Sequence, residues 1–540
     1  MAHRTQVTAK DDAGPVTGTE PTTQTSHLRA ASRITLMTFG SRILGLVRDV
    51  MMFQMLGFGW AVGTFATAWM VPNLLRRLFG EGALSASFIP LYTRLQDGDP
   101  AAGRRLISSV TGMLILLLGI ITAVVLTACF CVPPEWVGKA SVKDGTVLIS
   151  AQQQGQVLLD LTIILFPYAI PICLAAIFAG TLHAHGVFGL PAASPIVLNL
   201  FWIGGLGLAM YADLQDPAQI VTLLALCLLV GGAAQMCLSL VPLLRRRLLQ
   251  APTLPRAGDP GRQVLRNMGP TIVGMSLVQI STLMDTGFAY WLVDSAGPAF
   301  IYTANRLLLF PHALTALALA TAVFPRFSKL GASGNREELR KEVDVATRYT
   351  LFMALPAAVG MMLVAQPLID LMLVNERSTA EDLATANLTT VYLVASLPAI
   401  GVAQLHAKAL YAIGEYKAPA WMSFWLLLLN LLLNLIFVIG FDLGIPGLAL
   451  ATSIASAINA FALRRKVTSA CPGEGHKFRL WHTLAATAAM AGAVLGIQEW
   501  LLATSAWEQA LFDLALPIAG GIAVYGGVQF MLGQRTLRMR

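Results

Sequence analysis

Fourteen uninterrupted apolar runs recur along the chain, and each is about as long as the roughly 20 residues that a helix needs to cross a bilayer. Because the runs are continuous rather than alternating, they predict membrane-spanning helices and exclude an outer-membrane barrel. The predicted spans lie at 33–56, 60–82, 106–132, 157–182, 188–211, 219–243, 267–293, 298–321, 349–374, 386–413, 418–440, 444–463, 480–502 and 509–532.

Basic residues are distributed unevenly among the connections between these spans. Connections that follow even-numbered spans carry 21 Lys and Arg residues, among them Arg245, Arg246 and Arg247, whereas connections that follow odd-numbered spans carry three. Cytoplasmic loops of membrane proteins are enriched in Lys and Arg. One miscounted span would scramble this 21-to-3 split. The split therefore supports the count and predicts that both termini are cytoplasmic.

Two sequence segments recur in the second half of the chain. FIPLYTRL at 88–95 aligns with VFPRFSKL at 323–330, and AGTLHAHGVFGLPA at 179–192 aligns with AKALYAIGEYKAPA at 407–420. The pairs join the second span with the eighth and the fourth span with the tenth, so the two halves keep one membrane orientation. An axis along the membrane normal is expected to relate the halves, with a substrate site between them.

These patterns predict an all-α polytopic membrane protein with fourteen transmembrane helices. Two pseudo-symmetric six-helix lobes are followed by two extra C-terminal helices. The predicted parts are a polar cytoplasmic tail at 1–32, an N-lobe at 33–249, a C-lobe at 250–466, and a final helix pair with a basic tail at 467–540. The tail at 1–32 lacks an apolar core, so it is not expected to be a cleaved signal peptide.

Composition supports the same class of protein. Apolar residues make up 56% of the chain and charged residues 12%, about half the charged share of a soluble protein. The net charge of +8 is explained by the basic cytoplasmic loops, so nucleic acid is not an expected partner. Most of the six cysteines lie inside apolar runs, which indicates packing rather than a disulfide framework or a zinc site.

The informative residues are ionisable groups inside spans, because such groups are expensive in hydrocarbon and usually face a wet cavity. Arg48 lies roughly 20 Å into a core about 30 Å thick. The cationic groups outnumber their counter-ions, which favours an anionic substrate, since guanidinium groups match phosphate oxygens well. The cationic groups are Arg42, Arg48, Arg76, Arg77 and Arg306, and the acidic ones are Asp49, Glu81 and, less directly, Asp285.

We expect Arg48, Arg76 and Arg306 to converge between the lobes. Arg77 and Glu81 are four residues apart and can pair on one helix face, which leaves a structural role for Arg77 open. His183 and His185 are better explained as part of a helix-end loop than as a metal pair. A phosphate-cradling loop and a nucleophile elbow are absent from the sequence, so we expect no catalytic residues, no metal and no cofactor.

The motifs SRILGLVRD (41–49), PNLLRRLFGEGALSASFIP (72–90), MGPTIVGMSLVQIS (268–281) and NRLLLFP (305–311) closely resemble the MurJ (MviN) family. These are the lipid II flippases of bacterial peptidoglycan synthesis, in the multidrug/oligosaccharidyl-lipid/polysaccharide exporter superfamily. The resemblance runs from about residue 32 to residue 530. It implies an inner-membrane transporter that moves lipid II, the undecaprenyl-pyrophosphate-linked disaccharide-pentapeptide, to the periplasmic leaflet by alternating access. It also implies that the last two spans form a groove for the lipid tail.

Carried over by position, the family's cavity residues fall on Arg42, Arg48, Asp49, Arg76, Glu81 and Arg306. The sequence departs from the family at Gly63, where an acidic residue is common, and at Asn305, where an aspartate commonly precedes the arginine. Both departures make the cavity more cationic. They leave open whether transport is coupled to the membrane potential or to a monovalent ion. Membrane lipids are expected neighbours, and contacts with other cell-wall synthesis proteins stay open.

Three other functions are compatible with parts of this pattern. A related exporter of another polyprenyl-linked oligosaccharide fits the same charges, whereas an exporter of cationic drugs is expected to have unpaired acidic residues in its cavity. A membrane-embedded enzyme that acts on polyprenyl phosphates would need more unpaired carboxylates than Asp49, Glu81 and Asp285 supply. A scaffold without transport activity would require the buried arginines to be replaceable.

Overall fold

The structure is a computed structural model, and it describes residues 22–143, 146–255, 259, 261, 262, 264, 279–373, 378–473, 480–503 and 510–532. Within these residues the chain is almost entirely helical, as predicted, and one short antiparallel hairpin interrupts the helices. The first half contains α1 (Thr22–Leu56), α2 (Trp60–Leu75), the π-helical η1 (Arg76–Gly82), α3 (Ala83–Gly98), α4 (Pro100–Cys131), α5 (Pro134–Val137), β1 (Ser141–Lys143), β2 (Thr146–Ile149), α6 (Ala151–Leu165), η2 (Phe166–Tyr168), α7 (Ala169–Ala184), α8 (Gly189–Tyr211) and α9 (Pro217–Arg245).

The second half begins, within the described residues, with a helical stretch at 279–288. The elements that follow are η3 (Ala289–Val293), α11 (Gly297–His312), η4 (Ala313–Leu317), α12 (Ala318–Ala332), α13 (Arg336–Leu373), α14 (Ala380–Val394), α15 (Leu397–Ala412), α16 (Lys417–Leu435), η5 (Ile436–Gly440), α17 (Gly444–Ala470), α18 (Trp481–Ala503) and α19 (Ala510–Met531).

Eleven helices in the described part of the chain are long and apolar enough to cross a membrane. They coincide with the predicted spans three to six and eight to fourteen. Helix α1 and the continuous run α2–η1–α3 occupy the first two predicted spans, and the seventh is described only from residue 279. Helix α1 begins at Thr22, inside the predicted tail, and α3 continues to Gly98, well past the predicted end at residue 82.

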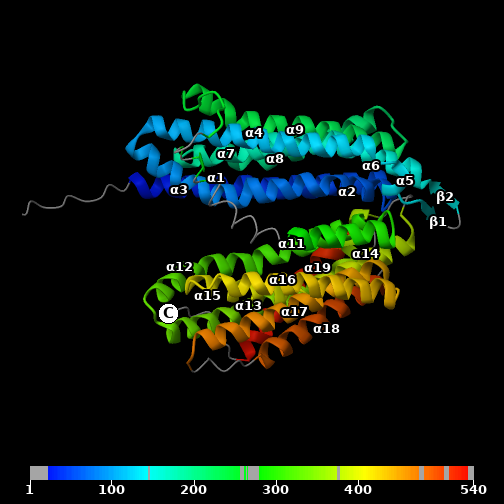
Figure 1. Ribbon diagram of the computed structural model, residues 1–540. Helices are drawn as coiled ribbons and strands as arrows, with labels where there is room; N and C mark the ends of the chain where they lie inside the picture. Colours follow the sequence, from blue (N-terminus) through cyan, green and yellow to red (C-terminus); the bar gives the residue numbers. More distant parts are fainter. Residues whose placement is uncertain are drawn as a thin grey trace, which may run out of the picture.

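The helices form two bundles that lie side by side in Figure 1, α1–α9 above and α11–α19 below. We call the end that carries residues 134–149 the hairpin end. The opposite end, where α9 ends at Arg245 and α17 ends at Ala470, is the basic end. Helices α18 and α19 pack against each other and against α13, so they are an addition to the second bundle. The fold thus has the two lobes and extra helix pair that the repeat predicted.

The repeated segments occupy matching places in the two lobes. In the N-lobe α3 packs on α7, and in the C-lobe α12 packs on α15. Helix α7 ends two residues before Gly186, whose φ is +72°, and α15 ends two residues before Gly414, whose φ is +79°. Glycine adopts this left-handed conformation without a steric penalty, which explains the shared glycine. A π-helical segment follows a proline-containing helix in both lobes, η1 after α2 and η4 after α11.

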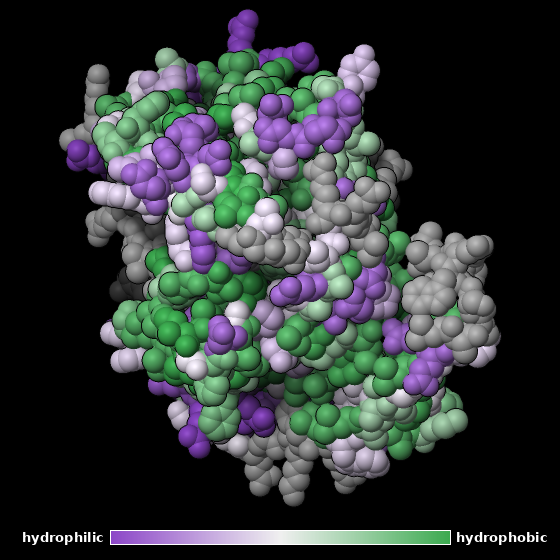
Figure 2. Space-filling model, turned by 90° about the vertical axis from the view of Figure 1, so that its right-hand side faces the viewer, coloured by the Kyte–Doolittle hydropathy of each residue, from purple (hydrophilic) through white to green (hydrophobic). Residues whose placement is uncertain are grey.

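One cluster of buried apolar side chains crosses from the N-lobe to the C-lobe near the hairpin end. Phe58 stacks on Phe300 with ring centroids 4.6 Å apart, and Met52 and Ile445 belong to the same cluster. Figure 2 looks at this end of the molecule and shows groups of hydrophilic side chains among the hydrophobic ones. The lobes are therefore packed together at the hairpin end.

Candidate functional site

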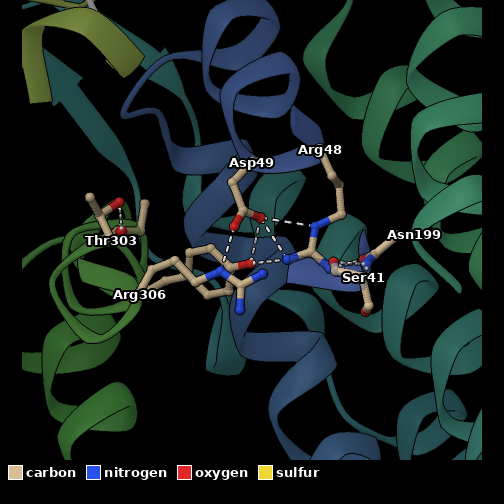
Figure 3. Close-up of polar contacts among 8 residues, drawn as sticks. Ser41, Arg48, Asp49, Asn199, Thr303 and Arg306 are labelled. Atoms are coloured by element: carbon tan, nitrogen blue, oxygen red, sulfur yellow. Dashed lines mark hydrogen bonds and ion pairs between the residues drawn. The ribbon is translucent and has the colours of Figure 1, made fainter. Parts of the chain in front are cut away.

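Asp49, in α1, is the centre of a buried polar cluster between the two lobes (Figure 3). One carboxylate oxygen, Oδ1, accepts from Arg48 Nε at 2.9 Å, from Arg48 Nη2 at 2.6 Å and from the Tyr302 hydroxyl at 2.9 Å. The other oxygen, Oδ2, accepts from Arg306 Nε at 2.5 Å. Tyr302 and Arg306 belong to α11, so one carboxylate joins the lobes.

Arg48 is held in place by the N-lobe. Its Nη1 donates to Asn199 Oδ1 in α8 at 3.1 Å, and its guanidinium carbon lies 4.1 Å from the ring centroid of Trp202 in the same helix. The Asn199 amide in turn donates to the backbone oxygen of Ser41 at 2.9 Å. This combination of stacking on a ring and several hydrogen bonds suits arginine better than lysine. Arg48 therefore has a fixed orientation.

Arg306 is less enclosed than its partners. Its side chain is 36% exposed, compared with 8% for Arg48 and 1% for Asp49. Among the described residues only its Nε has a hydrogen-bond partner, and in Figure 3 the two terminal nitrogens point away from Asp49. Nη2 lies over Gly45, where an added Cβ would be 2.8 Å away. The exposed half of this guanidinium can therefore bind an anion.

The cluster carries a net positive charge, because two arginines share one carboxylate and the tyrosine is neutral. A buried charge without a counter-ion is costly, so the second guanidinium is stabilised by a further anion or by water. The sequence-level expectation of a cationic surplus between the lobes agrees with this geometry at Arg48 and Arg306.

Arg42 and Arg76 lie elsewhere in this conformation. Arg42 is exposed on α1, six residues before Arg48 and thus about 9 Å further along the helix axis. Arg76 donates from Nε to Asn73 Oδ1 at 3.1 Å, within its own helical run. Trp69 contacts Trp202 at the level of Arg48, so Arg76 is about 10 Å closer to the basic end. The expected convergence thus includes Arg48 and Arg306 but not Arg76.

Arg77 contacts the other lobe. Its Nη1 donates to Gln279 Oε1 at 3.2 Å, a contact that the predicted pairing with Glu81 did not anticipate. The Glu81 side chain lies outside the described residues. Asn305 donates to the backbone oxygen of Ile301, one turn earlier in α11, and does not contact the Asp49 cluster.

The structure gives a steric reason for the glycine at position 63, where the sequence departs from the family that it resembles. A Cβ added at this position would lie 1.9 Å from the backbone oxygen of Ser295 in the C-lobe. Any side chain at residue 63 would therefore push the lobes apart at the hairpin end. The glycine permits a backbone-to-backbone contact between lobes, which the sequence alone did not predict.

Asp285 is not a counter-ion for the arginines, contrary to the sequence-based suggestion. Its carboxylate accepts from Asn434 Nδ2 at 2.7 Å and from the Thr452 hydroxyl at 3.4 Å, inside the C-lobe. Asn430 also bonds Asn434, at 3.2 Å. These asparagines were overlooked, although their spacing of four residues within the leucine run LLLLNLLLNL places both on one helix face.

Sequence reasoning also missed Asn199, Trp202 and Tyr302. Each lies within an apolar span and contacts Arg48 from a distant part of the chain. The sequence signal available for Asn199 is its position as an amide inside an apolar helix, which needs a buried partner. Trp202 and Tyr302 carry no comparable signal.

Comparisons with known proteins agree on one family. The sequence model of the family described as "Lipid II flippase MurJ" matches residues 52–515. The "Probable lipid II flippase MurJ" of Bdellovibrio bacteriovorus is 30% identical over 516 residues, which cover 94% of this chain and 95% of the relative. The "Lipid II flippase MurJ" of Burkholderia cenocepacia is 28% identical over 528 residues, covering 94% of this chain and 97% of the relative.

Solved structures show the same fold. A structure described as "Lipid II flippase MurJ, inward closed conformation" superposes with a TM-score of 0.74 at 23% identity, covering 94% of this chain and 99% of that one. An inward-facing transporter of the multidrug resistance MATE family, from the MOP superfamily, superposes with a TM-score of 0.64 at 16% identity, covering 82% of this chain and 98% of that one.

Proposed function

The chain belongs to the lipid II flippase MurJ family, and we propose that it moves lipid II from the cytoplasmic to the periplasmic leaflet by alternating access. It is a multi-pass membrane transporter and not an enzyme. The substrate proposed is the undecaprenyl-pyrophosphate-linked disaccharide-pentapeptide, whose pyrophosphate supplies the anion.

The observation that carries this proposal is the Asp49 cluster. Arg48 from the N-lobe and Arg306 from the C-lobe both bind one carboxylate. An anion that enters between the lobes can bind the exposed terminal nitrogens of Arg306, and it then competes with Asp49 for the charge of this guanidinium. Guanidinium groups bind phosphate oxygens in a bidentate manner. A pyrophosphate in this place therefore interacts with the same groups that hold the lobes together.

Competition for Arg306 gives the substrate a means to change the conformation. When phosphate oxygens take over the guanidinium, the ion pair between Arg306 and Asp49 no longer favours the packed lobes. A ligand shifts a conformational equilibrium only by binding the two states differently. The bound head group therefore favours opening at the hairpin end, and the ion pair re-forms after the lipid leaves. Arg42 and Arg76, which lie on the basic-end side of this cluster, and Asn305, beside Arg306, are proposed to line the path.

The proposed orientation follows from the basic loops. The basic end faces the cytoplasm together with both termini, and the hairpin end faces the periplasm, in the inner membrane of a bacterium. The chain contains no phosphate-cradling nucleotide-binding loop. The membrane potential or a monovalent-ion gradient is therefore the proposed energy source, and no cofactor is invoked.

The second candidate is a related exporter of the same superfamily. The MATE neighbour shows the shared fold, but an exporter of cationic drugs is expected to present acidic groups to its substrate. Here the buried group between the lobes carries two arginines and one aspartate. An exporter of another polyprenyl-linked oligosaccharide would use the same pyrophosphate chemistry, so this alternative is separated by experiment.

The test is complementation of a bacterium depleted of its own lipid II flippase. Expression of this chain is expected to restore growth and to make lipid II accessible to a lipid II-binding probe added outside the cells. Arg306→Ala, at matched membrane levels, serves as the negative control. Failure of the wild-type chain to expose lipid II, despite normal insertion, would refute lipid II as the substrate. Export of a different polyprenyl-linked oligosaccharide in the same cells would support the alternative.

A further inference from the structure

Lys139 connects the two lobes at the hairpin end. Its Nζ donates to the backbone oxygen of Val293 at 2.7 Å and to that of Trp291 at 3.3 Å. Both acceptors lie in η3 of the C-lobe, whereas Lys139 follows α5 of the N-lobe. In return, the Trp291 indole donates to the backbone oxygen of Val137 at 3.2 Å. The two lobes therefore exchange hydrogen bonds in both directions.

The N-lobe holds Lys139 firmly. Gly138 and Gly155 pack backbone against backbone, since a Cβ added to either would lie 1.8 Å from a carbonyl oxygen of the facing segment. The fully buried Gln154 accepts from the Lys139 backbone N–H at 2.8 Å and donates to the Thr64 hydroxyl at 3.1 Å. The lysine side chain therefore projects from a rigid platform made by α2, α5 and α6.

The C-lobe presents the acceptors at a helix end. The last carbonyls of a helix have no partner within the helix, and a cation near them is favourable. The turn that follows η3 is fixed by the Asp294 side chain, which accepts from the Ala296 backbone N–H at 2.6 Å. This turn leaves the Trp291 and Val293 oxygens to Lys139. Burial lowers the pKa of the Lys139 ammonium, and Asp294 opposes that shift, as expected for a cation partly withdrawn from water.

We infer that Lys139 is a latch that holds the hairpin end of the lobes closed and so sets how often the transporter opens on that side. Opening at this end must break both Lys139 bonds, because donor and acceptors belong to different lobes. Lys139 is a positioning residue that acts on the conformational equilibrium. The inference rests on the alternating-access part of the proposed function and is independent of the identity of the substrate.

The test measures a distance across the hairpin end in the purified full-length protein, reconstituted in lipid nanodiscs without lipid II. Spin labels are placed on Gln215→Cys, in the exposed connection between α8 and α9, and on Glu381→Cys, in the exposed first turn of α14, after replacement of the native cysteines. The variants are Lys139→Met, which removes the donor, and Lys139→Arg, which retains one. Lys417→Ala is the matched control, because it removes one exposed cation far from the latch, near the basic end.

We expect Lys139→Met to increase the ratio of long to short distances about tenfold, which corresponds to about 1.4 kcal/mol. For Lys139→Arg and Lys417→Ala, the ratio of long to short distances should stay within about twofold of that of the unsubstituted protein. A twofold change corresponds to about 0.4 kcal/mol. Equal distance distributions for Lys139→Met and the unsubstituted protein, with unchanged elution and helix content, would overturn the latch. An equal shift for Lys417→Ala would also overturn it, because the effect would then reflect charge alone.

The two proposals fail separately. The distance measurement contains no lipid II, so a shifted distribution together with failed complementation would contradict only the proposed substrate. Successful complementation by the wild-type chain with an unshifted Lys139→Met distribution would contradict only the latch.

Discussion

The ion pair between Asp49 and Arg306 can be tested with a double-mutant cycle. Asp49→Asn keeps one acceptor oxygen for Arg48 and Tyr302 but places a neutral amide beside Arg306. Arg306→Gln removes the cation and leaves Asp49 paired with Arg48. Each single change should favour the state in which the lobes separate at the hairpin end. The double variant should shift less than the sum of the two, because the pair is already lost in each single variant.

The expected magnitude follows from burial. Asp49 is 1% exposed and Arg306 is 36% exposed, so the pair lies between two limits. Removing one partner of a fully buried pair costs about 3–5 kcal/mol, whereas exposed pairs contribute about 0–1 kcal/mol. We expect a coupling energy of about 2 kcal/mol between Asp49 and Arg306, which is about 30-fold in the ratio of open to closed lobes.

The assay is the spin-label distance across the hairpin end, recorded for the unsubstituted protein, the two single variants and the double variant in one lipid composition. The ratio of long to short distances gives each conformational free-energy difference. The matched control is Lys417→Ala, because it removes an exposed cation far from this ion pair, near the basic end. It tests whether any loss of charge produces the shift.

A coupling energy below about 0.5 kcal/mol, the scale of ordinary additivity errors, would refute the reasoning. Asp49 and Arg306 would then be neighbours that contribute nothing to lobe closure. Opposite shifts from the two single variants would refute it equally, since a shared bond cannot be lost with opposite effects.

Three further predictions concern orientation, guanidinium geometry and lobe contact. A cysteine at Gln250 should resist a membrane-impermeant thiol reagent added outside cells and a cysteine at Leu148 should react; the reverse pattern would contradict the cytoplasmic basic end. Arg48→Lys should impair lipid II export and Arg48→Ala should abolish it, measured with matched expression, because lysine lacks the planar fork; normal export by both would show that Arg48 is structural. Gly63→Ala should raise the open fraction at the hairpin end several-fold, as read by spin-label distances, since its Cβ would meet the Ser295 oxygen at 1.9 Å; an unchanged fraction would show that the lobes adjust without opening.

The sequence indicated which ionisable residues lie inside the predicted spans, but it was a poor guide to what they contact. Arg48 and Arg306 were identified because a buried guanidinium is costly in a bilayer, and that cost depends on residue type and depth alone. Arg76 satisfied the same criterion but lies about 10 Å further along its helix run, bonded to Asn73. Asp285 likewise belongs to a separate network with Asn434. The depth of a charged side chain in a span therefore indicates how costly its burial is, but not which residues it contacts.

The sequence by itself determined the helical class, the two-lobe repeat and the surplus of buried cations, because hydrophobic length, loop charge and internal similarity are local properties of the chain. Only the tertiary structure decided that Asp49 meets Arg306 across 257 residues, that Gly63 lies against Ser295, and that Lys139 reaches the end of η3. Each of these contacts joins one lobe to the other. Their geometry depends on how the two bundles pack against each other, which no local pattern encodes.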